Sequence, residues 1–195
     1  MTIRQRLLKW LYPLVLWARK RSGAAKHLQN AAGKRPPVPF YSLTIELANG
    51  KSLPLENLRG KRVLLVNTAS NCGYTRQYEE LQTLYRHSRE DLEIIAFPAN
   101  DFKEQEKGSD SEILSFCQNV YGIGFPVARK AVVVKAENQH PLYQWLTQKE
   151  KNGWNEQAPA WNFAKYLVNE EGMLTHYFDP GISPLDTEMQ KAVHH

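Results

Sequence analysis

The fold of this chain is decided by residues 63–75, which read Val63-Leu64-Leu65-Val66-Asn67-Thr68-Ala69-Ser70-Asn71-Cys72-Gly73-Tyr74-Thr75. The aliphatic run predicts a buried strand, and the polar, glycine-containing part after it predicts a turn. Apolar residues then recur at helical spacing from Tyr78 to Tyr85, and Thr75 is placed to cap a helix over about 75–90. We therefore expect Cys72 between a strand end and a helix start.

This position favours a reactive thiol at Cys72. Unpaired N–H groups and the helix dipole stabilise an anion at a helix N-terminus, so they lower the pKa of a cysteine beside them. The alternative is a buried, inert cysteine, which is the commoner fate of an isolated Cys. Position alone puts the reactive alternative only slightly ahead.

The positive charge of the chain is concentrated at one end. Of its 25 Lys and Arg residues, nine lie in residues 1–36, which contain no Asp or Glu, so residues 37–195 carry 16 basic and 20 acidic residues. A mildly acidic domain argues against nucleic-acid binding. The 195 residues provide for one domain, which we place at 37–195, and a basic N-terminal segment at 1–36.

The cysteine and histidine spacings exclude several classes of site. Two cysteines, Cys72 and Cys117, with no C-x-x-C motif do not make a disulfide-stapled secreted scaffold. The six histidines lack the paired spacing of a zinc site, and Gly122-Ile123-Gly124 lacks the third glycine and the setting of a phosphate loop. We expect no metal and no bound cofactor.

The N-terminal segment has three alternative interpretations. Its apolar residues share one side of a helical wheel, opposite Arg6, Lys9 and Lys20, and the run is too short to span a bilayer. It could lie on anionic lipid, each basic residue adding roughly 1 kcal/mol, pack on its own domain or a partner, or be a secretory signal. Basic residues where cleavage should occur make the last alternative the weakest. We expect a cytoplasmic protein, peripheral to the membrane under the first alternative.

Strands and helices alternate through the first half of the domain. Residues 34–39 are rich in proline and predict a linker. The expected strands are 40–47, 52–55, 63–66, 92–97, 131–134, 163–168 and 173–178, and the expected helices cover 75–90, a segment opened by the Ser109 capping box, 141–147 and 184–193. This order predicts an α/β, thioredoxin-like three-layer sandwich. Because ligands bind beyond the carboxyl ends of strands in such sheets, Cys72, Asn100-Asp101 and the loop before Phe163 should meet there.

Three segments resemble the signatures of the glutathione peroxidase family. They are 67–75 (NTASNCGYT), 97–106 (FPANDFKEQE) and 161–163 (WNF), and 113–117, Tyr121 and 125–126 match the segment between the last two. The resemblance covers roughly residues 39–190 and implies a peroxidase. At the position of Cys72 the family carries the peroxidatic residue, which becomes a sulfenic acid. Trp161 and Asn162 match two further members of its catalytic tetrad, whose N–H groups stabilise negative charge.

One tetrad position departs from the family. Asp101 stands where a glutamine is usual, and an ionised carboxylate near Cys72 would raise the thiol pKa. Our hypothesis is that Asp101 accepts or shuttles the proton of Cys72. The alternative is that Asp101 faces solvent and three residues suffice.

The resemblance also suggests how the sulfenic acid is resolved. Cys117 lies where the non-selenium, thioredoxin-recycled members carry their resolving cysteine, so it would form a disulfide with Cys72 that thioredoxin reduces. A disulfide needs Cα atoms within about 7 Å, so the helix of Cys117 would have to unwind in part. If Cys117 is only a core residue, glutathione or another thiol would resolve Cys72.

The segment between Val134 and Trp161 lacks the long insertion of tetrameric family members, which resembles the monomeric branch that admits lipid hydroperoxides. A redox sensor or adaptor on the same fold is the alternative function. A thioredoxin-type oxidoreductase is disfavoured, because Thr75 replaces the second cysteine of a C-x-x-C motif.

Overall fold

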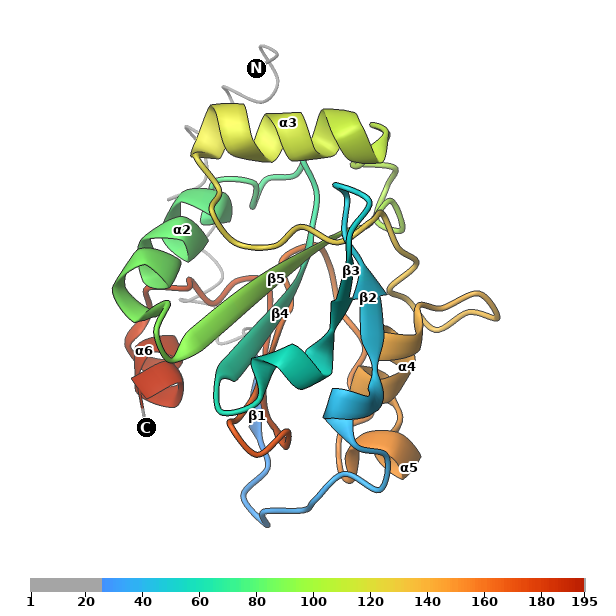
Figure 1. Cartoon of the computed structure of the whole chain (residues 1–195), viewed down its shortest axis with the longest axis vertical. Coiled ribbons are helices and arrows are strands. Elements are labelled where there is room, and N and C mark those ends of the chain that lie inside the picture. The colour runs from blue at the N-terminus through green and yellow to red at the C-terminus, as the bar shows by residue number, and fades with distance from the viewer. Residues whose placement is uncertain (1–25, 195) are drawn as a thin grey trace.

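A five-stranded mixed sheet forms the centre of the computed structural model, which describes residues 26–194 (Figure 1). The strand order is β1-β7-β6-β4-β5, and β4 and β5 are parallel whereas the other neighbours are antiparallel. A separate antiparallel hairpin pairs β2 with β3. The strands are β1 (His27–Gln29), β2 (Thr44–Glu46), β3 (Ser52–Pro54), β4 (Arg62–Thr68), β5 (Leu92–Pro98), β6 (Lys165–Val168) and β7 (Leu174–Phe178).

Helices cover both faces of this sheet because β4 is apolar on both of them. Leu64 and Val66 belong to one core cluster, which takes in α2 (Gln77–Ser88), α3 (Asp110–Tyr121) and α6 (Thr187–His194). Val63 and Leu65 point the other way, into a cluster with α4 (Pro141–Thr147). In Figure 1, α3 lies across one end of the sheet. The arrangement confirms the predicted three-layer sandwich.

Three predictions that rest on short-range sequence motifs are confirmed. The Ser109 hydroxyl accepts the Glu112 N–H, and the Glu112 carboxylate accepts the Ser109 N–H at 2.8 Å, which is the predicted capping box of α3. Helix α4 has the predicted bounds and begins at Pro141. The turn at 48–51 joins β2 to β3 as predicted.

Other element predictions need correction. The segment 131–134 is not a strand, because the Ala131 N–H bonds to the carbonyl of Pro98, the last residue of β5, and the Val133 N–H bonds to the Asp101 side chain in the loop that follows. The predicted strand 40–47 is shortened by the turn of helix η1 (Phe40–Ser42). Two short helices, η2 (Leu55–Leu58) and α5 (Lys149–Asn152), were not predicted.

The sheet also takes in a strand from the segment that we assigned to the N-terminal extension. Strand β1 pairs with β7 from His27 opposite Phe178 to Gln29 opposite His176. The predicted start of the domain at residue 37 therefore leaves out a strand that belongs to its sheet. The predicted amphipathic helix lies outside the described residues. Within residues 26–194, no helix has the length and apolar character needed to cross a membrane.

Candidate active site

Three loops meet at the carboxyl ends of β4 and β5. The loop after β4 carries Cys72, the loop after β5 carries Asp101, and the segment that leads into β6 carries Trp161 and Asn162. The hydrogen bond from Asn162 Nδ2 to Gln105 Oε1, at 2.9 Å, links the second and third loops. The bond from the Asn71 N–H to the Gln105 carbonyl, at 3.2 Å, links the second to the first.

A tight turn holds Cys72. The Thr75 hydroxyl accepts the Cys72 N–H at 3.0 Å and donates to the Ala69 carbonyl at 2.9 Å, while the Tyr74 N–H points at Cys72 Sγ at 3.5 Å. Thr75 therefore stabilises this turn and does not cap α2, which begins at Gln77. Cys72 is only 2% exposed, so a peroxide has to reach a nearly covered sulfur.

Burial and hydrogen bonding act on the pKa of Cys72 in opposite directions. Burial raises the pKa above its ordinary value of 9.0, and it outweighs the opposing groups. Those groups lower the pKa by favouring the thiolate, and they are the Tyr74 N–H, the Asn162 amide, the Trp161 indole and the Gly73 N–H, in decreasing order. The expectation of a lowered pKa is wrong for the resting site, because desolvation costs the anion more than these donors return.

Asn67 places the Trp161–Asn162 pair beside Cys72. Its Nδ2 donates to the Trp161 carbonyl at 3.0 Å, its Oδ1 accepts the Ala164 N–H at 3.1 Å, and its backbone carbonyl accepts the Phe163 N–H. Phe163 has a φ of 69°, a left-handed conformation that a bulky residue rarely adopts. The bonds of Asn67 hold this strained turn, which keeps the indole and the amide near enough to the sulfur to lower its pKa.

Asp101 lies in the loop after β5 but is bonded elsewhere. Its Oδ2 accepts the Val133 N–H at 2.9 Å. The groups that shift the pKa of Cys72 do not include Asp101. Its role as a proton acceptor therefore stays a prediction.

Cys117 occupies the inner face of α3 and is fully buried. Burial raises the pKa of its thiol to about 12, although the neighbouring Tyr78 hydroxyl opposes this rise. Cys72 and Cys117 are both free thiols and belong to the same core cluster. The structure thus brings the two cysteines to one side of the sheet in the reduced state.

The sequence analysis gave no role to four residues that support the site, which are Asn67, Ser70, Gln105 and Glu106. The buried carboxylate of Glu106 accepts both the N–H, at 2.8 Å, and the hydroxyl of Ser70, two positions before Cys72. Gln105 bonds Asn162, and Asn67 holds the turn at Phe163. All four lie at or inside the quoted family segments, which was the available signal.

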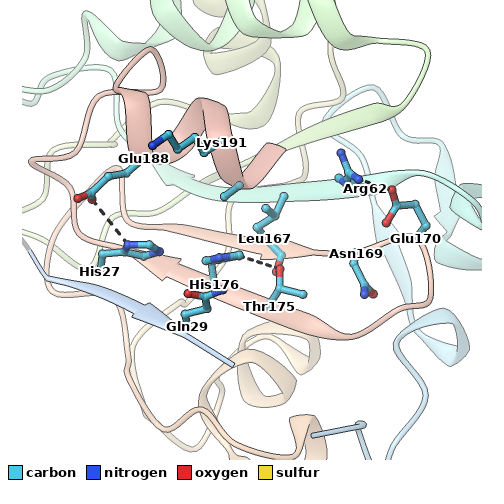
Figure 2. Close-up of a pocket in the computed structure, with 11 residues that line it drawn as sticks. His27, Gln29, Arg62, Leu167, Asn169, Glu170, Thr175, His176, Glu188 and Lys191 are labelled. Carbon is cyan, nitrogen blue, oxygen red and sulfur yellow. Dashed lines mark hydrogen bonds and ion pairs between the residues drawn. The ribbon is translucent and has the colours of Figure 1, made fainter. Parts of the chain in front are cut away.

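A cavity of about 550 Å³ lies elsewhere, between α6 and the strands β1, β6 and β7 (Figure 2). Its lining includes Arg62, the first residue of β4, whereas Cys72 follows the other end of that strand. In Figure 2, His27 points toward Glu188, and their side chains lie 3.6 Å apart. Neither cysteine lines this cavity, so it is not the thiol site. Among residues 26–194 no cluster of side chains is suited to a metal ion.

Comparisons with known proteins agree with this geometry. A profile of the family described as "Glutathione peroxidase" matches residues 40–147. The glutathione peroxidase homolog BsaA of Bacillus subtilis is 38% identical over 152 residues, which are 77% of this chain and 94% of that protein. The glutathione peroxidase-like peroxiredoxin gpx1 of Schizosaccharomyces pombe is 45% identical over 136 residues, 69% of this chain and 85% of that protein.

Solved structures show the same fold. The crystal structure of Trgpx in its apo form has a TM-score of 0.61 at 29% identity and covers 82% of this chain and 97% of its own. T. cruzi GPX1 has a TM-score of 0.60 at 28% identity and covers 79% of this chain and 92% of its own. These likenesses confirm the thioredoxin-like fold, and with the sequence matches they show that the chain belongs to the glutathione peroxidase family and is an oxidoreductase of the peroxidase class.

Proposed function

We propose that the peroxidase reaction of this chain takes place at Cys72 and reduces hydrogen peroxide and organic hydroperoxides, including those of lipids. The observation that carries this assignment is the surroundings of one sulfur: the Tyr74 N–H points at Cys72 Sγ at 3.5 Å, and the Asn162 amide and the Trp161 indole both lower the pKa of Cys72. Donors aimed at a place where negative charge develops lower the barrier of the reaction that develops it. A structural cysteine in a core has no need of them.

The sulfur of Cys72 attacks one oxygen of the O–O bond. A sulfur–oxygen bond forms, the O–O bond breaks, and two electrons pass from sulfur to the peroxide. The leaving oxygen takes the proton that the thiol gives up and departs as water or an alcohol, which leaves a sulfenic acid. Because burial raises the pKa of the thiol, the reactive thiolate is disfavoured in the resting site, and a group that accepts the proton favours the reaction.

Asp101 is our candidate for the group that accepts this proton. Its Oδ1 makes no hydrogen bond with the residues that the structure describes, whereas Oδ2 is taken by Val133. A bound hydroperoxide or a water could relay the proton between Cys72 and Oδ1. Replacing Asp101 with Asn, which keeps an acceptor for the Val133 N–H, should then slow the oxidation of Cys72 and change its pH profile. An unchanged rate and profile would rule the role out.

Cys117 is the candidate resolving residue. Its thiol would attack the Cys72 sulfenic acid, forming the disulfide and releasing water, and a dithiol such as thioredoxin would reduce that disulfide. Relatives in Schizosaccharomyces pombe and Saccharomyces cerevisiae are named peroxiredoxins, which supports a protein thiol as reductant. A thiol with a pKa of about 12 inside a helix is a poor nucleophile, so α3 has to unwind first.

Two alternatives remain proposals with their own tests. A one-cysteine peroxidase would leave Cys117 in the core and use glutathione. A sensor or adaptor would pass oxidation of Cys72 to a partner and show no sustained turnover with any thiol reductant. Monomeric behaviour and contact of residues 1–36 with a membrane surface are likewise proposals. Sedimentation with anionic liposomes, with and without residues 1–36, tests the contact.

The buried carboxyl group of Glu106, which bonds Ser70, should make the stability of the fold depend on pH. Burial raises the pKa of Glu106 from 4.5 to about 7, so the folded protein holds this proton more tightly than the unfolded chain does. In the window between these values, the free energy of unfolding therefore falls as the pH rises, and the contribution is constant on either side. The slope from one such group is at most about 1.4 kcal/mol per pH unit.

Replacing Glu106 with Gln should flatten this slope. The amide oxygen can still accept the Ser70 N–H, and the amide nitrogen can donate to the Ser70 hydroxyl. Urea unfolding of wild type and variant between pH 4.5 and about 7 measures the effect. Glu137→Gln, at an exposed position, is the matched control and should keep the wild-type slope. Equal slopes in Glu106→Gln and wild type would contradict the assignment.

The two-cysteine cycle predicts a specific product. One equivalent of hydrogen peroxide should give a Cys72–Cys117 disulfide in the wild type and a Cys72 sulfenic or sulfinic acid in Cys117→Ser, by intact mass and non-reducing peptide mapping. Cys72→Ser should lose turnover. A Cys72 sulfenic acid without the disulfide in the wild type would make glutathione or another thiol the resolving agent. An unmodified Cys72 would end the peroxidase assignment to this residue.

Unwinding of α3 predicts that its N-cap controls disulfide formation. Ser109→Ala removes the capping box and should weaken the first turn by about 1 kcal/mol, so the disulfide should form several-fold faster after a peroxide pulse. Ser115→Ala, at an exposed position of the same helix, is the control and should form it no faster than the wild type. Equal rates in both variants would show that opening of this turn does not limit the step.

A further inference from the structure

Two aromatic rings lie side by side near Cys72. Phe102 belongs to the loop after β5, and Trp161 comes from the segment that leads into β6. Their ring centroids are 5.4 Å apart with the ring planes tilted by 43°, and both residues are partly exposed. The Trp161 indole is also near enough to Cys72 to lower the pKa of its thiol. The two rings therefore give the surroundings of the sulfur an apolar surface that solvent reaches.

The ammonium group of Lys103 lies over one of these rings. Its Nζ is 5.8 Å from the centroid of the Trp161 ring, within the range of about 6 Å for a cation–π contact, and the residue is exposed. Within residues 26–194, Lys103 makes this ring contact but no hydrogen bond or ion pair. Glu104 and Lys107, in the same loop, pair with each other at 2.7 Å. The charge of Lys103 is therefore available to a ligand.

The backbone that carries Lys103 is strained. The φ values are 52° at Lys103 and 50° at Glu104, a left-handed conformation that residues with a Cβ seldom adopt. The Glu106 N–H donates to Asn100 Oδ1 at 2.9 Å and so closes the loop around these two residues. Strain of this kind persists where the surroundings hold it, and it is concentrated at active sites and ligand-binding sites. Here the strained turn is the one that carries an ammonium group over the indole.

A cation beside an apolar surface fits one kind of hydroperoxide. The acyl chain of a fatty-acid hydroperoxide can lie on aromatic rings, and its carboxylate supplies the charge that an ammonium group binds. Hydrogen peroxide and uncharged alkyl hydroperoxides have no group for Lys103 to bind. Glutathione carries carboxylates but no long apolar chain, so the two rings favour the hydroperoxide over this reductant as the ligand.

We propose that Phe102, Lys103 and Trp161 form a recognition site for amphipathic hydroperoxides that carry a carboxylate, with Lys103 selecting charged over uncharged substrates. The inference rests on the proposed function of Cys72 and names the substrate class that this surface favours. Lys103 acts on the encounter with the substrate and on the bound complex. The chemical step at the sulfur stays as described above.

The test compares one substrate with and without its charge. The second-order rate constant for oxidation of Cys72 by the hydroperoxide of linoleic acid, divided by that for its methyl ester, measures the preference in the absence of any reductant. Lys103→Met keeps a side chain of similar length and removes the charge, so this ratio should fall about three- to five-fold, as expected for an exposed ion pair. Lys103→Arg keeps the charge and should keep the ratio.

Arg86→Met is the control for a general loss of positive charge. Arg86 is exposed in the last turn of α2, whereas Cys72 precedes the first turn of that helix, so the ratio should stay at its wild-type value. Raising the salt concentration should lower the ratio in the wild type more than in Lys103→Met, because salt screens exposed charges. A ratio that is equal in Lys103→Met and wild type, or one that falls as far in Arg86→Met, would overturn the proposal.

A binding measurement separates this proposal from the proposed function. In a Cys72→Ser background, calorimetric titration with linoleic acid below its micelle concentration should show binding that Lys103→Met weakens about three- to five-fold. Equal affinities with and without Lys103→Met would overturn the recognition site. Binding that depends on Lys103 in this way, in a protein whose wild type reduces no hydroperoxide, would overturn the proposed function and leave the recognition site standing.

Discussion

The hydrogen bonds of Asn67 join the two halves of the active site. This residue is fully buried near the end of β4, and its side chain bonds the Trp161 carbonyl and the Ala164 N–H, 94 and 97 positions along the chain. Leaving such buried groups unpaired would cost about 1–3 kcal/mol each. Because β4 also leads directly into the loop of Cys72, these bonds bring Trp161 and Asn162 to the end of the strand that Cys72 follows. The bonds of Asn67 also hold the left-handed turn at Phe163.

Around that junction, the sulfur is in a balance between burial and hydrogen bonding. Burial favours the neutral thiol, and the donors favour the thiolate, with burial ahead in the resting protein. Because the thiolate is the reactive form of a cysteine, this balance controls the reactivity of the sulfur. Cys117 is the more strongly protected of the two, since its pKa is about 12 and it lies within α3. Both cysteines are thus free thiols whose pKa values burial raises.

Sequence patterns predicted the features that short-range motifs determine. The sequence predicted strand β4, the capping box of Ser109 and the position of Cys72 just after a strand. The family segments added Trp161 and Asn162. Features that depend on distant partners were not readable. Strand β1 has three residues and exists through its pairing with β7. Residues 131–134 are apolar enough for a strand, but they bond to β5 only at its last residue, Pro98. The pKa of Cys72 is raised because the thiol is buried, and no local sequence pattern predicts how deeply a residue is buried.

The same reasoning explains why Gln105 and Glu106 passed unnoticed. Both were inside a quoted segment, yet only the folded loop shows that one bonds Asn162 and the other Ser70.

The most direct measurement is the second-order rate of oxidation of the wild type by hydrogen peroxide as a function of pH, with Cys72→Ser as the reference. Burial of a thiol whose pKa lies above 9.0 predicts a rate that is still rising at about pH 9, and no reaction of this kind in Cys72→Ser. A rate that levels off below about pH 7, or one that survives in Cys72→Ser, would contradict the balance of burial and donors described for this sulfur.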